Sequence, residues 1–156
     1  MSDANLIIRP VFPIDLPKLI DLYTHLSPTD APIDLSTAET RLSEIAAIPF
    51  SHVFGGWWQD SLVTSCTLLI LPNLTRGGKP YALIENVVTH SAHRQKGHGK
   101  AVLQHATRYA FDKGCYKVML LTGASAPETL AFYQSAGFEQ TKTGFQIRNI
   151  PARAEG

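Results

Sequence analysis

The chain has 156 residues, 44% of them hydrophobic, and its 14 Lys and Arg against 13 Asp and Glu give a formal net charge of +1. This length and composition predict one domain over residues 1–156 that buries a core without disulfide bonds or metal ions. The near-neutral charge argues against nucleic acid as a partner. Without a long apolar run or a leader-like N-terminus, we expect no membrane association and a cytoplasmic location.

The first half of the chain alternates between β-rich runs and apolar residues with helical spacing. Asp15 is a candidate cap for the first helix, and Ser36 to Glu39 has the pattern of a capping box. The predicted elements are a strand at 6–11, a helix from Asp15 that ends before Ser27, a helix at 36–47, and strands at 52–58 and 62–71.

The second half predicts a strand at 81–89, a helix at about 97–113, a strand at 116–122, a helix at 127–135, and a hairpin of strands at 138–141 and 145–150. The strand, helix and strand between 81 and 122 form one right-handed βαβ unit. The fold class is therefore α/β, with a mixed sheet of about seven strands and helices on both faces.

The most informative motif is Arg94-x-x-Gly97-x-Gly99, which stands between an apolar strand and a helix. Backbone N–H groups at such a helix start favour an anion, and the glycines let a phosphate approach closely. Two familiar nucleotide motifs do not fit, because the dinucleotide fingerprint needs a third glycine and a P-loop needs Ser or Thr where Ala101 stands. The turn predicts a pyrophosphate site, although glycines that serve only backbone geometry remain the alternative.

Glu85 is an acidic residue inside an otherwise apolar strand, where a charge is costly unless it is paired or used. One interpretation is a salt bridge to Arg76, Lys79 or a helix side chain. The other is a general base that acts on a substrate ammonium directly or through water.

Several histidines, cysteines and a serine are further candidates for a catalytic base or nucleophile, but the sequence around them supports these roles less well. His90, His93 and His98 crowd the glycine turn and are either secondary proton-transfer candidates or solvated loop side chains. Cys66 and Cys115 lie in apolar runs without CxxC spacing, so we expect buried thiols and no metal site. Neither Cys115 nor Ser125 has the His and carboxylate partners of a covalent catalyst, which favours direct transfer.

The element order, the Arg94-x-x-Gly97-x-Gly99 turn and the FYQSAGF segment at 132–138 together resemble the GNAT family of acetyl-CoA-dependent N-acetyltransferases over residues 6–150. The resemblance implies a mostly antiparallel GNAT-type sheet around one βαβ cofactor unit, with acetyl-CoA as cosubstrate. Tyr133 is similar to the family residue that protonates the departing thiolate, and a phenol of pKa about 10 suits that step. The implied cosubstrate-binding residues are Val87, Val88, Thr89, Arg94, Gln95, Lys96, Gly97, His98, Gly99, Lys100 and Phe132, with backbone N–H groups of 95–100 around the pyrophosphate.

The pantetheine arm of such a cosubstrate behaves like an added strand, so we expect the strands that end at Thr89 and Thr122 to splay apart. The stretches 84–88 and 114–120 are most similar to glucosamine-6-phosphate N-acetyltransferases, and the loop 75–79 could offer positive charge to a phosphate. Asn86 and Leu121 stand where those enzymes carry acidic residues. The resemblance therefore implies that the acetyl acceptor is the primary amine of a small molecule, without indicating which one.

Two alternative functions remain open, namely acetylation of protein or peptide amines and coenzyme A binding without catalysis. A homodimer is also possible, since GNAT proteins are often dimers and Trp57, Trp58 and Phe145 could form an apolar face. The alternative for the two tryptophans is a place in the core.

Overall fold

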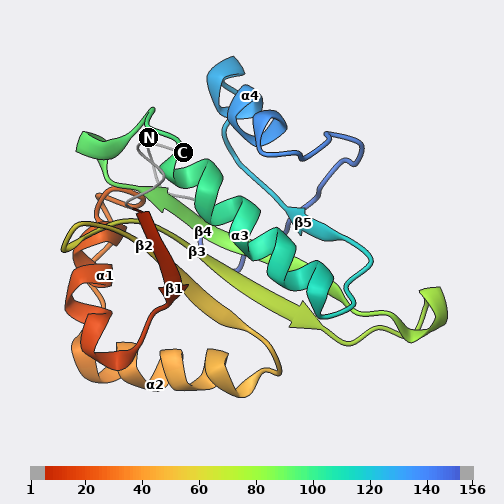
Figure 1. Cartoon of the computed structure of the whole chain (residues 1–156), viewed down its shortest axis with the longest axis horizontal. Helices are drawn as coiled ribbons and strands as arrows, with labels where there is room; N and C mark the ends of the chain where they lie inside the picture. Colours follow the sequence, from red (N-terminus) through yellow and green to blue (C-terminus); the bar gives the residue numbers. More distant parts are fainter. Residues whose placement is uncertain (1–5, 152–156) are drawn as a thin grey trace.

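Five strands form one sheet in the computed structural model, which describes residues 6–151 (Figure 1). The strands lie side by side in chain order, the first three pairs antiparallel and the last pair parallel. The predicted mixed, mostly antiparallel sheet is confirmed, but the predicted count of about seven strands is wrong, since residues 6–151 contain five. The strands are β1 (Leu6–Pro10), β2 (His52–Trp58), β3 (Ser61–Leu71), β4 (Tyr81–Thr89) and β5 (Val118–Leu120).

Helices cover both faces of this sheet, as predicted (Figure 1). Helices α1 (Leu16–Tyr23) and α2 (Leu35–Ala47) pack on one face, and α3 (His98–Asp112) packs on the other with α4 (Pro127–Ser135) beside it. Each face has its own cluster of buried side chains, so the sheet is the middle layer of three. None of the helices within residues 6–151 is both long enough and apolar enough to cross a bilayer.

Of the two predicted helix caps, the capping box at Ser36 is wrong and Asp15 is confirmed in position only. The N-cap of α2 is Asp34, whose carboxylate accepts a hydrogen bond from the backbone N–H of Thr37 at 2.8 Å, so the helix begins ahead of the predicted capping box. Asp15 is the N-cap residue of α1, as predicted, but its carboxylate makes no capping hydrogen bond to that helix and pairs with the Arg9 guanidinium at 2.9 and 3.1 Å. This pair links β1 to the start of α1, and it lowers the pKa of Asp15.

The predicted C-terminal hairpin is also wrong, because residues 138–151 contain no strand. A strand needs a paired neighbour and a face to bury, and β5 pairs with β4 over three residues only. Phe145 and Ile147 are 91% and 100% exposed. The segment still passes close to the sheet, since a Cβ built on Gly144 would lie 2.8 Å from Cδ2 of Leu121.

The two tryptophans of β2 differ in burial. Trp57 is buried with the Arg9 guanidinium 3.8 Å from the centre of its ring, and Trp58 is half-buried beside His98. Trp57 thus takes the alternative place in the core, Trp58 is partly exposed, and Phe145 alone of the three residues is largely exposed. Cys66 and Cys115 are buried free thiols, as predicted.

Candidate active site

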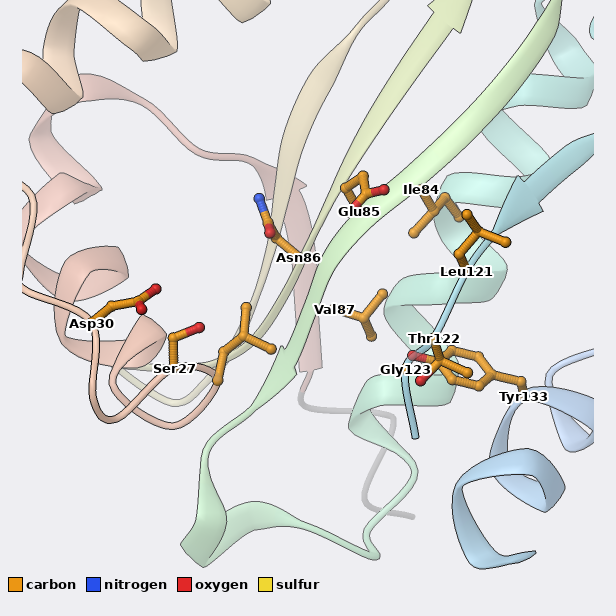
Figure 2. A pocket seen from close by; sticks show the side chains of 11 residues that line it. Ser27, Asp30, Ile84, Glu85, Asn86, Val87, Leu121, Thr122, Gly123 and Tyr133 are labelled. Atoms are coloured by element: carbon orange, nitrogen blue, oxygen red, sulfur yellow. The ribbon is translucent and has the colours of Figure 1, made fainter. Parts of the chain in front are cut away.

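The site begins where β4 and β5 separate. The two strands pair only between Ala82–Ile84 and Val118–Leu120. Beyond that point β4 continues to Thr89 while the chain after β5 turns away from it (Figure 2). The predicted splay is confirmed, and it leaves an opening along the second half of β4.

A β-bulge in β4 shapes this opening. Glu85 pairs with Thr67 and Val88 with Ser65, so Asn86 and Val87 together stand opposite the single residue Cys66. Asn86 has a positive φ of 54°, a left-handed conformation that asparagine tolerates better than most residues. A bulge bends its strand and interrupts the ladder, which changes the direction of the neighbouring side chains.

A cleft of about 330 Å³ lies at the bulge. Figure 2 shows Ser27 and Asp30 to one side of β4, and Leu121, Thr122 and Tyr133 to the other. Glu85 from β4 and Tyr133 from α4, which the sequence predicted as the catalytic pair, both line this cleft. Its lining residues are Leu26, Ser27, Asp30, Ile84, Glu85, Asn86, Val87, Leu121, Thr122, Gly123 and Tyr133.

Glu85 is exposed and lines the cleft. No salt bridge to Glu85 occurs among residues 6–151. The Arg76 guanidinium instead lies 5.4 Å from the centre of the Tyr116 ring, and Lys79 precedes Glu85 by six residues, which is about 20 Å along an extended strand. The salt-bridge interpretation is therefore not supported, and the carboxylate faces the cleft.

Tyr133 is half-buried at the cleft, and its surroundings keep the phenol protonated. Burial is the larger cause that raises the pKa of Tyr133, and the nearby Cys66 thiol raises this pKa further. Burial also raises the pKa of Cys66 itself to about 12, so this thiol does not ionise near neutral pH. The cleft thus offers a neutral phenol as a proton donor and no thiolate as a nucleophile.

The predicted pyrophosphate turn leads into α3 without a side-chain cap. Gly97 is the N-cap residue with a positive φ of 83°, and as a glycine it has no side chain that could cap the first turn. Residues 94–97 are exposed. Backbone N–H groups at the start of a 15-residue helix, next to this exposed turn, have the donor chemistry that a pyrophosphate needs.

Gly99 allows the turn to lie close to its neighbours. A Cβ at this position would meet Oγ1 of Thr89 at 3.0 Å and Cζ of Phe132 at 3.1 Å. The start of α3 therefore packs directly against the end of β4 and against α4. This contact holds the turn next to the cleft.

The other predicted cosubstrate residues have differing environments. Val87 lines the cleft, whereas Val88 is buried in the core under α1 and α2. Oγ1 of Thr89 lies 3.0 Å from Oγ1 of Thr64, so this side chain is engaged within the sheet. At Val88 and Thr89, therefore, only the backbone groups are suited to hydrogen bonds with a ligand that lies beside β4 like an added strand.

Arg94, the first residue of the turn motif, has a structural role in this arrangement. Its Nε donates to the carbonyl of Thr89 and its Nη2 donates to the carbonyl of His25, both at 3.2 Å. Nδ1 of His25 in turn accepts a hydrogen bond from the backbone N–H of Ser91 at 3.3 Å. The residues that follow α1 are therefore tied to the pyrophosphate turn.

Four histidines form a continuous column beside the turn. The ring centres of His25 and His90 are 3.9 Å apart, those of His90 and His93 are 5.5 Å apart, and those of His93 and His98 are 6.2 Å apart. His98 is buried, so the expectation of solvated loop side chains is wrong for this residue. None of the four lines the cleft, which leaves Glu85 as the better proton acceptor.

Sequence reasoning missed two residues of this region, His25 and Asp30. Their contacts with the site span more than 50 residues of sequence, and the segment between α1 and α2 has no motif that predicts where it lies. Within residues 6–151, no three His, Cys, Asp or Glu side chains are grouped to hold a metal ion.

Comparison with known proteins identifies the family. The description of the matching family model is "Acetyltransferase (GNAT) family", and the match covers residues 18–138. The chain belongs to the GNAT acetyltransferase family. It is thus an acyltransferase, as the sequence predicted.

Individual relatives agree with this family membership. A glucosamine 6-phosphate N-acetyltransferase of Trypanosoma brucei brucei is 34% identical over 145 residues, which is 88% of this chain and 92% of that protein. Glucosamine 6-phosphate N-acetyltransferase 1 of rice is 28% identical over 84% of this chain and 79% of its own length. The structure of a putative acetyltransferase from Agrobacterium tumefaciens has a TM-score of 0.87 at 47% identity and covers 92% of this chain and 99% of that one.

Proposed function

We propose that this GNAT protein transfers an acetyl group from acetyl-CoA directly to the primary amine of a small molecule. The observation that carries the proposal is that Glu85 and Tyr133, from β4 and α4, line one cleft at the point where β4 and β5 splay. The cleft therefore combines a proton acceptor and a proton donor.

The N-terminal turn of α3 would hold the donor. Backbone N–H groups of 95–100 would bind the pyrophosphate, and the backbone of Val87, Val88 and Thr89 would pair with the pantetheine arm in the gap between the strands. Phe132 lies against Gly99, between this turn and the cleft. Bound acetyl-CoA would supply an activated acetyl thioester.

Glu85 would prepare the acceptor. An ammonium group must lose a proton before its nitrogen can attack a carbonyl carbon, and an exposed carboxylate can bind the cation and accept that proton directly or through water. Asp30 lines the same cleft and adds a second acidic residue that favours a positively charged acceptor.

Tyr133 would complete the reaction as the proton donor. When the bond between the carbonyl carbon and sulfur breaks, the thiolate takes the phenolic proton, and the raised pKa of Tyr133 ensures that this proton is present at neutral pH. A covalent acetyl-enzyme is not needed. Both cysteines have raised pKa values and neither lines the cleft, which supports direct transfer.

The test is acetyl-CoA-dependent thiol release with a panel of small amines, aminosugars and short peptides, with the acetylated product identified by its mass. We expect thiol release that requires a small amine and an N-acetyl product of matching mass. Preferential transfer to peptides would replace the small-molecule acceptor with a protein one. Tight acetyl-CoA binding without acceptor-dependent thiol release would instead favour a non-catalytic coenzyme A-binding module.

A further inference from the structure

A second cavity of about 270 Å³ adjoins the cleft and has a different chemical character. Leu26, Ser27, Asp30 and Asn86 line both cavities, so the two share one wall. The remaining lining of the second cavity is mostly apolar. It consists of Ile20, Tyr23 and Thr24 from α1 and its end, with Ala31, Pro32 and Ile33 from the segment before α2.

Tyr23 adds to the apolar character of this second cavity. Its side chain hydrogen-bonds to Thr67 of β3, and burial raises the pKa of the phenol, so Tyr23 remains neutral. Among the described residues that line the second cavity, Asp30 is the one acidic or basic side chain, and it lies on the side shared with the cleft.

Neither cavity has a lysine, arginine or histidine among its lining residues, within the part of the chain that the structure describes. The positive charges predicted for a phosphate, in the loop 75–79, lie at the opposite end of β4 from the bulge. Arg94 is tied to two backbone carbonyls, one of them that of His25. A phosphate in this cleft would lie close to two acidic side chains, those of Glu85 and Asp30, which disfavour a further anion.

We propose that the second cavity is an apolar subsite of the acceptor pocket, and that the acceptor is a cationic amine with an apolar group and no phosphate. The inference rests on the proposed acetyl transfer, because it places the reacting amine at Glu85. The ammonium group lies in the cleft with the two carboxylates, and the apolar group extends past Leu26 and Asn86 to contact Ile33 and Tyr23. Such an acceptor differs from the glucosamine 6-phosphate named for the trypanosomal and rice relatives.

The first test compares straight-chain amines from propylamine to hexylamine with glucosamine 6-phosphate. Each additional buried methylene is worth about 0.8 kcal/mol, so kcat/KM should rise about fourfold per methylene until the cavity is filled. Glucosamine 6-phosphate should be a poorer acceptor than hexylamine. A flat series, or glucosamine 6-phosphate as the better acceptor, would overturn the apolar subsite.

The second test changes the subsite without changing the catalytic pair. Ile33 is 38% exposed in the segment before α2, so Ile33→Asp should fold, and it should lower kcat/KM for hexylamine at least tenfold while leaving propylamine nearly unchanged. Ile14→Asp is the matched control, since Ile14 is 87% exposed and lines neither cavity. An equal loss for both amines in Ile33→Asp would contradict the subsite.

Binding of hexylamine measured by calorimetry separates this inference from the proposed function. If hexylamine binds, binding weakens in Ile33→Asp and no acetyl group is transferred, then the subsite stands and the proposed enzyme activity is wrong. If acetyl transfer occurs but favours phosphorylated or peptide amines, then the activity stands and the subsite is wrong.

Discussion

At the scale of single residues, two side chains of the cleft should differ in what they contribute. Replacement of Glu85 by glutamine keeps the shape of the side chain but removes the proton acceptor. Loss of a positioned acid or base typically costs 10²- to 10⁴-fold, so we expect kcat to fall about 100-fold or more with little change in acetyl-CoA affinity.

The measurement for Glu85→Gln is kcat as a function of pH, with Glu39→Gln on the exposed surface of α2 as the control. The control should behave like the original chain. An unchanged kcat and an unchanged pH profile in Glu85→Gln would show that another group accepts the proton.

Tyr133→Phe removes only a hydroxyl group. If this hydroxyl protonates the departing thiolate, kcat should fall at least tenfold while the Kd of acetyl-CoA, measured by calorimetry, stays within about twofold. Tyr116→Phe provides the comparison, because Tyr116 lies outside the cleft beneath Arg76. A larger effect on binding than on kcat would assign Tyr133 to cosubstrate binding alone.

Sequence patterns predicted these two residues but not His25 and Asp30. Glu85 is conspicuous because a charge interrupts an apolar strand, and Tyr133 belongs to a family motif. His25 and Asp30 acquire their roles through tertiary contacts, such as the bond between Arg94 and the His25 carbonyl 69 residues away. Local pattern and spacing contain no information about such contacts.

At the scale of elements, the close contact at Gly99 joins the start of α3 to the end of β4. A methyl group there would approach Thr89 and Phe132 at about 3 Å. We expect Gly99→Ala to reduce the free energy of unfolding by about 1–3 kcal/mol, as overpacking does, and to weaken acetyl-CoA binding by displacing the turn.

Denaturant unfolding and calorimetry with acetyl-CoA would check the Gly99 prediction. Gln104→Ala, at an exposed position of the same helix, is the control and should alter neither quantity. Acetyl-CoA affinity that is unaffected by Gly99→Ala would indicate that the pyrophosphate does not bind at this turn.

The elements themselves were predictable where pattern and local signals agree. The bounds of β4 and α4 match the prediction to the residue, since a β-rich run after Pro80 and a proline-initiated helix are strong local signals. The absence of a hairpin after Gly137 could not be predicted from the sequence. Its alternating apolar residues need a neighbouring strand to pair with, and β5 is too short to provide one. Alternating apolar and polar residues indicate that a segment can form a strand, but they do not show whether a neighbouring strand is available.

At the scale of the whole molecule, four partly buried histidines should make the protein sensitive to mild acid. Loss of hydration on burial is the largest cause that lowers the pKa below the usual 6.5 in His25, His52, His93 and His105. The unfolded chain therefore takes up protons near pH 6.5 before the folded chain does, and the free energy of unfolding should fall as the pH drops below about 6.5.

Urea unfolding followed by tryptophan fluorescence between pH 8 and pH 5 would measure this dependence. The expected slope is up to about 1.4 kcal/mol per pH unit for each proton that only the unfolded chain binds. A second loss should follow below about pH 3.8, where Asp15 and Asp34, whose pKa values are lowered, become protonated on unfolding. Stability that is constant or rises from pH 7 to pH 5.5 would contradict the histidine contribution.

A homodimer remains a prediction at this scale. The exposed apolar side chains of Phe145, Ile147 and Ile150 lie in the segment after α4 and provide a surface that a second copy could cover. Of the two tryptophans that the sequence suggested for this role, Trp57 is buried and Trp58 is half-buried.

The most direct test of the central claim is a crystal structure of the protein with bound coenzyme A. The account predicts the pyrophosphate at the backbone N–H groups of 95–100, the pantetheine arm beside Val87 to Thr89, and the sulfur in the cleft near Tyr133. Coenzyme A bound elsewhere, or bound at the turn with its sulfur directed away from Glu85 and Tyr133, would contradict the assignment of this cleft as the acetyl-transfer site.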